Sequence, residues 1–94
     1  MNRESILTFL KQHKQLLVEK YHVKTIGLFG SYATEHNTDK SDIDILVDMP
    51  SSFDLYYDLK EFLEKSFKKS VDLGLKHNVR SLIKEKIDKE IIYV

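Results

Sequence analysis

The chain has 94 residues, with 15 Lys plus Arg balanced by 15 Asp plus Glu. This length fits one compact domain, so we expect residues 1–94 to form a single domain with no room for a second, substrate-recognising one. The balanced charge leaves no basic excess to hold a phosphate backbone, so direct binding of nucleic acid is not expected. The absence of cysteine excludes disulfides and thiolate nucleophiles.

The sequence shows no targeting or membrane segment. The N-terminal residues lack the continuous apolar stretch and small-residue cleavage site of a signal peptide, and no segment approaches the length of a membrane span. A cysteine-free chain is also compatible with a reducing cytosol. We therefore expect a cytoplasmic protein.

The first third of the chain predicts a helix, a strand and a short helix. Apolar residues recur at helical spacing over residues 3–21, which predicts one amphipathic helix. Residues 23–29 are rich in β-formers and end at Gly30 and Ser31, which predicts a strand entering a tight turn. A short helix is expected over residues 31–36.

The middle of the chain predicts a second strand and a long helix. Aspartates alternate with apolar residues over residues 42–47, which indicates a strand with Asp42 and Asp44 on the same face. Ser51 and Asp54 match a capping-box pattern, and apolar residues at helical spacing follow as far as Phe67.

The last third predicts two more strands around a helix. Residues 70–75 have the composition of a short strand, Asn78 is expected to cap a further helix, and residues 91–94 are expected to add a last strand. Helices and strands therefore alternate along the chain. This order predicts an α/β fold with a mixed β-sheet flanked by helices.

The candidate chemistry lies in a glycine–serine turn and three aspartates. Ten residues separate Ser31 from Asp42, Asp44 follows two residues later, and Asp72 lies in the next predicted strand. A glycine at a strand-to-helix turn lets the backbone approach a phosphate closely, and the hydroxyl of Ser31 adds a donor.

Carboxylates two residues apart on a strand repel each other unless a cation lies between them. Mg²⁺ prefers such hard oxygen ligands and commonly combines one or two carboxylates with phosphate oxygens. Asp72 is a candidate to bind a second metal ion and to accept the proton of an attacking hydroxyl, although a solvent-facing role would also explain it. The sequence thus predicts a two-metal site for a nucleoside triphosphate.

The stretch from Phe29 to Ala33, together with residues 41–47, resembles the minimal nucleotidyltransferases of the polymerase-β-type superfamily. The resemblance is to the short antitoxin-like members that pair with HEPN-domain toxins. It implies that Gly30 and Ser31 grip the phosphates of ATP, and that Asp42, Asp44 and Asp72 form the catalytic metal site.

The resemblance also implies an activity and a partner. The implied reaction is transfer of AMP from ATP to a hydroxyl of a HEPN toxin, with tyrosine as the expected acceptor, which would make the chain an antitoxin. Phe53 and Tyr57 are candidates for part of a partner surface. The chain departs from the family pattern after Ser31, where Tyr32 and Glu35 stand in place of an Arg and a Gly; this puts rate and nucleotide affinity in question.

Two alternatives remain open from the sequence. One is a non-catalytic antitoxin that neutralises its toxin by stoichiometric binding. The other is the catalytic subunit of a split nucleotidyltransferase that acts on a small molecule.

Overall fold

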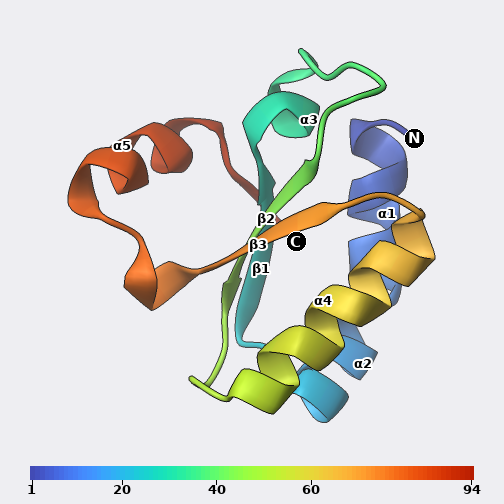
Figure 1. Cartoon of the computed structure of the whole chain (residues 1–94), viewed down its shortest axis with the longest axis vertical. Helices are drawn as coiled ribbons and strands as arrows, with labels where there is room; N and C mark the ends of the chain where they lie inside the picture. The colour runs from blue at the N-terminus through green and yellow to red at the C-terminus, as the bar shows by residue number, and fades with distance from the viewer.

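The computed structural model describes residues 1–94 as one mixed sheet with helices on both sides (Figure 1). The elements in chain order are α1 (Arg3–Gln12), α2 (Lys14–Tyr21), β1 (Thr25–Phe29), α3 (Gly30–Thr34), β2 (Ile43–Asp48), α4 (Phe53–Phe67), β3 (Val71–Leu75), the 3-10 helix η1 (Lys76–Asn78), α5 (Ser81–Glu90) and β4 (Ile92–Tyr93). The four strands lie in the order β3-β2-β1-β4. Strand β1 is antiparallel to β2 and β4, whereas β2 and β3 are parallel. The predicted α/β class with a mixed sheet is confirmed.

One face of the sheet carries the hydrophobic core. Alternate residues of β2, namely Ile43, Ile45 and Val47, are fully buried. They belong to a single cluster with apolar residues of α1, α2 and α4. Figure 1 shows these three helices together on one side of the sheet. Burial of this apolar face is the main force that fixes the strand register.

The opposite face is more polar and is covered on one side by α5 (Figure 1). Because side chains alternate along a strand, this face receives Asp44 from β2 and Asp72 from β3. Near β4, the side chains of Ile91 and Tyr93 occupy the space beside Gly27, where a Cβ would lie 2.8 Å from Ile91 and 3.0 Å from Tyr93. The aspartates therefore lie on a face that is only partly covered.

The prediction of one helix over residues 3–21 is wrong, because the chain breaks at His13 into α1 and α2. His13 has φ −101° and ψ 10°, which is not helical. The carbonyl of Phe9 accepts a hydrogen bond from the His13 backbone N–H at 3.0 Å and from its ring Nδ1 at 2.9 Å. The side chain thus caps α1 at the point where one continuous helix was expected.

Two predicted helix caps are also wrong. The N-cap of α4 is Ser52, whose hydroxyl accepts from the backbone N–H of Leu55 at 3.4 Å, whereas the hydroxyl of Ser51 bonds Nε2 of His77 at 2.8 Å. Asn78 ends η1 instead of capping α5, which begins three residues later without a side-chain cap. The contact between Ser51 and His77 accounts for the shifted start of α4, and the extra turn η1 accounts for the shifted start of α5.

The other predicted elements are present, with ends that move by one or two residues. The last strand, for example, is the short β4. None of the helices combines the length and the apolar character that crossing a membrane requires.

Candidate active site

Strand pairing brings the predicted site residues to one end of the sheet. The antiparallel pairing of β1 and β2 places Phe29, the residue before Gly30, opposite Asp44. The parallel pairing of β2 and β3 places Asp44 opposite Asp72. Asp42 lies one residue before β2, at the same end. The residues that the sequence proposed from three separate segments are therefore neighbours.

Gly30 lies directly beside the side chain of Asp44. Its φ of 74° lies in the left-handed region that glycine adopts without cost. A Cβ at this position would overlap Oδ2 of Asp44. Glycine is thus required both by the turn and by the neighbouring carboxylate. Ser31 follows in the first turn of α3, and no side chain caps this end of the helix.

The electrostatics of the site centre on Asp44. Partial burial, followed by the charges of Asp72 and Asp42, raises the pKa of Asp44 from 3.8 to about 6. A hydrogen bond with Asp72 and, as the smallest contribution, the charge of Glu90 act in the same direction. Loss of solvation and like charges both disfavour the ionised carboxyl.

The three aspartates fit a divalent cation by their chemistry. The structure holds no group of three or more His, Cys, Asp or Glu side chains already arranged as metal ligands. However, the charges of Asp72 and Asp42 add to burial in raising the pKa of Asp44, and a bound cation would relieve this repulsion. Carboxylate oxygens are also the ligands that Mg²⁺ prefers. The donor set is therefore suited to Mg²⁺ together with phosphate oxygens.

Glu90 and Arg3 were not identified from the sequence, whereas Tyr32 and Glu35 were named there as departures from the family pattern. The negative charge of Glu90, at the end of α5, contributes to the raised pKa of Asp44. Arg3 pairs with Glu35 at 2.8 Å between Nη2 and Oε1. No local pattern links these positions, since each contact joins segments that are far apart in the sequence. Tyr32, at one of the positions that depart from the family pattern, is only 2% exposed and packs in the core.

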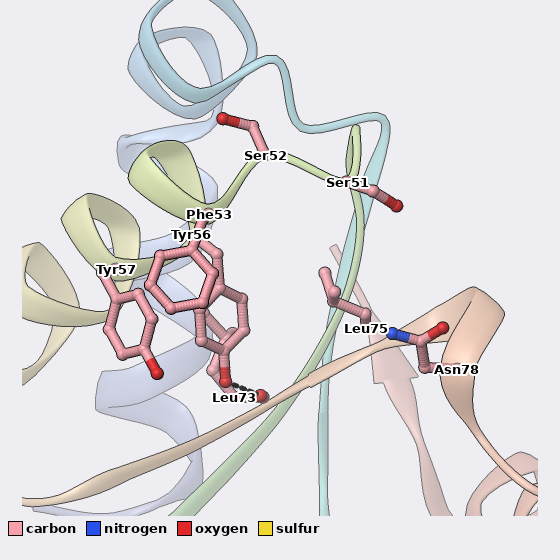
Figure 2. A pocket seen from close by; sticks show the side chains of 8 residues that line it. All are labelled: Ser51, Ser52, Phe53, Tyr56, Tyr57, Leu73, Leu75 and Asn78. Carbon is pink, nitrogen blue, oxygen red and sulfur yellow. Dashed lines mark hydrogen bonds between the residues drawn. The ribbon is translucent and has the colours of Figure 1, made fainter.

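A separate cavity of about 500 Å³ lies along the edge of β3 (Figure 2). Its lining comes from the start of α4, the preceding loop, β3 and η1, and none of the five proposed site residues contributes to it: Ser51, Ser52, Phe53, Tyr56, Tyr57, Leu73, Leu75 and Asn78. The hydroxyl of Tyr56 donates to the carbonyl oxygen of Leu73 at 2.6 Å, drawn as a dashed line in Figure 2. Phe53 and Tyr57, the candidates for a partner surface, are 77% and 50% exposed.

A family model and named relatives match this chain in sequence. The family described as nucleotidyltransferase domain matches residues 10–94. A Methanocaldococcus jannaschii protein whose name assigns it as a protein adenylyltransferase is 43% identical over 94 residues, covering 95% of this chain and 94% of the relative. The protein adenylyltransferase MntA of Thermococcus cleftensis is 38% identical over 93 residues, covering 97% and 94%.

Solved structures agree on the fold. A structure described as a minimal nucleotidyltransferase matches with a TM-score of 0.83 at 22% identity, covering 98% of this chain and 95% of that one. A toxin–antitoxin crystal structure with AMP-PNP matches with a TM-score of 0.70 at 22% identity, covering 99% and 72%. At these identities the likeness shows the fold, and the predicted nucleotidyltransferase fold is confirmed. The chain therefore belongs to the nucleotidyltransferase domain family and is a nucleotidyltransferase.

Proposed function

We propose that the chain transfers AMP from Mg²⁺-bound ATP to a hydroxyl of a partner HEPN-domain toxin, and that this modification makes it an antitoxin. The observation that carries the proposal is the alignment of the Gly30 turn, Asp44 and Asp72 across β1, β2 and β3. The names of the relatives support the adenylyl group, and the toxin–antitoxin complexes among the structural neighbours support a HEPN partner.

Each proposed site residue has a role in this reaction. Gly30 and Ser31 hold the phosphates through backbone N–H groups and the serine hydroxyl. Asp42 and Asp44 hold Mg²⁺, and Asp72 completes a two-metal site. When bound, the metal ions neutralise charge on the phosphates and on the attacking and leaving oxygens.

The proposed reaction is an in-line displacement at the α-phosphorus of ATP. The acceptor oxygen forms a bond to the α-phosphorus, and the bond from that phosphorus to the bridging oxygen of the β-phosphate breaks. Pyrophosphate leaves, and the proton of the acceptor hydroxyl passes to Asp72. Tyrosine is the acceptor that we expect on the toxin.

The proposal includes the setting of the reaction. Residues 1–94 act as one catalytic domain, and the toxin supplies the acceptor hydroxyl. The complex acts in the cytoplasm, where ATP is available. Nucleic acid is not a direct ligand of this chain, in keeping with its balanced charge.

The test is transfer of label from α-labelled ATP to the HEPN-domain partner in the presence of Mg²⁺. Parallel reactions contain the double variant Asp42→Asn with Asp44→Asn, or γ-labelled ATP in place of α-labelled ATP. We expect label on the partner only with the unmodified chain and α-labelled ATP. Label from γ-labelled ATP would indicate phosphorylation. Absence of label despite complex formation would favour an antitoxin that acts by binding alone, and label on an added small molecule would favour a split small-molecule enzyme.

A further inference from the structure

Glu35 adopts a backbone conformation that its side chain does not favour. It ends α3 with φ 62° and ψ 28°, in the left-handed region. A non-glycine residue in this region is strained by contact between its Cβ and the backbone. A residue that keeps this conformation is held there by its surroundings. The backbone N–H groups of Glu35 and His36 donate to the carbonyl oxygen of Ser31, and the side chain of Glu35 also forms an ion pair with Arg3.

The side chain of Arg3 makes two contacts with the C-terminal end of α3. Its Nη2 lies 2.8 Å from Oε1 of Glu35, and its Nη1 donates to the carbonyl oxygen of Ala33 at 3.4 Å. That carbonyl is in the last turn of α3, where helix carbonyls lack partners within the helix and a cation interacts favourably with the helix dipole. The guanidinium of Arg3 therefore binds both the carboxylate of Glu35 and a carbonyl oxygen at the end of α3.

The backbone of Arg3 is itself fixed. Asn2 and Ser5 form a reciprocal capping box around it, with Ser5 N–H donating to Oδ1 of Asn2 at 2.9 Å and Asn2 N–H donating to Oγ of Ser5 at 3.0 Å. The side chain of Arg3 is 34% exposed, so part of its length is buried against the protein. The capping box thus fixes the first turn of α1, from which the side chain of Arg3 reaches α3.

A helix as short as α3 depends on such contacts. Its five residues are too few to form a stable helix alone. Its first residue, Gly30, touches Asp44, so a small tilt of α3 would move the turn relative to the carboxylates. The buried side chains of Tyr32 and Ala33 hold its middle, and Arg3 holds its far end.

We propose that Arg3 is a positioning residue for nucleotide binding: through Glu35 and the Ala33 carbonyl, it holds α3 at the angle at which the Gly30–Ser31 turn receives the phosphates. This inference rests on the proposed function. Arg3 lies before residues 10–94, the part of the chain that the family model matches.

The experiment compares Arg3→Gln, Glu35→Gly and the double variant in the full chain. The readouts are the Kd for α,β-methylene ATP with Mg²⁺, measured by calorimetry, and the free energy of unfolding in urea. Because a partly exposed ion pair contributes little free energy, each single variant is expected to bind the nucleotide about three- to fivefold more weakly. The double variant is expected to be no weaker than the weaker single variant, because both changes break the same contact.

Glu35→Gly separates positioning from stability. Glycine adopts a φ of 62° without strain, so this variant is expected to be at least as stable as the unmodified chain while it binds the nucleotide more weakly. The matched control is Lys65→Gln, which removes the exposed Lys65–Glu61 pair on α4 and should leave Kd unchanged. In transfer assays, the KM for ATP should rise in the Arg3 and Glu35 variants with little change in kcat.

The outcomes are distinct. Weaker binding in Arg3→Gln but unchanged binding in Glu35→Gly would mean that the ion pair with Glu35 does not position the turn, which would overturn the proposed route through Glu35. Unchanged Kd in both variants would overturn it as well, while leaving the proposed function intact. If the unmodified chain does not bind the nucleotide at all, both the positioning role and the proposed function are overturned.

Discussion

Gly30 and Asp44 are in such close contact that no side chain fits at position 30, because a Cβ there would overlap Oδ2 of Asp44. The turn that is proposed to bind phosphate and the carboxylate that is proposed to bind metal are therefore held against each other by the end of β1 and the start of β2. This contact makes the geometry of the site sensitive to small changes at either residue.

Gly30→Ala is expected to reduce both stability and transfer. The left-handed backbone would cost about 1–2 kcal/mol, and displacement of Asp44 would add about 1–3 kcal/mol. Urea unfolding measures the loss. The matched control is Gly74→Ala, where a Cβ would lie 3.4 Å from Cδ1 of Leu46 and the backbone is not left-handed. We expect the control to cost less than about 1 kcal/mol; equal losses at the two positions would contradict the argument.

Asp44→Asn is expected to stabilise the fold at high pH. Because the pKa of Asp44 is raised from 3.8 to about 6 in the folded chain, its contribution to stability is fully present below pH 3.8 and is lost as the pH rises through 6. This difference corresponds to about 3 kcal/mol, which solvent screening of the half-exposed carboxyl reduces to about 1–2 kcal/mol.

Urea unfolding at pH 4, 6 and 8 checks this expectation. Asp44→Asn should be more stable than the unmodified chain at pH 8, and the gain should shrink towards pH 4. Asp58→Asn, an exposed change on α4, is the control and should show no such trend. A gain for Asp44→Asn that is the same at all three pH values would contradict the titration argument.

Mg²⁺ is expected to raise the melting temperature more at pH 8 than at pH 5. With a pKa of about 6, Asp44 is largely protonated at pH 5 and must release its proton before it binds a cation. Thermal unfolding with and without Mg²⁺ measures the difference. The double variant Asp42→Asn with Asp44→Asn should show no Mg²⁺ effect at either pH; a shift retained in this variant would place the metal elsewhere.

Tyr56→Phe is expected to cost about 1 kcal/mol of stability. The lost hydroxyl donates to the carbonyl of Leu73 on β3, an edge strand, at 2.6 Å. Partial burial also raises the pKa of Tyr56, so the hydroxyl remains a donor in the alkaline range. Tyr57→Phe is the matched control, because no hydrogen bond to the Tyr57 hydroxyl is present in the structure. Chemical denaturation of the two variants should differ by the value of this one bond.

The sequence could predict elements whose signals are local. The alternation around Asp42 and Asp44 indicated a strand, and Gly30 with Ser31 indicated the turn before a helix. It could not predict the break at His13, because the apolar spacing continues through it and the capping bond to Phe9 depends on a ring orientation. The predicted cap of α4 was wrong for a similar reason: the hydroxyl of Ser51 is hydrogen-bonded to His77, which lies far away in the sequence.

For the site, the sequence by itself determined the chemical groups: a glycine-containing turn and carboxylates spaced to share one face of a strand. These follow from backbone sterics and from the two-residue period of a strand, which are properties of neighbouring residues. Only the tertiary structure decided that Asp72 lies opposite Asp44, that the charge of Glu90 acts on Asp44 and that Arg3 pairs with Glu35. Those contacts depend on the order and register of the strands and on helix packing, which burial of the whole apolar face sets and no single segment encodes.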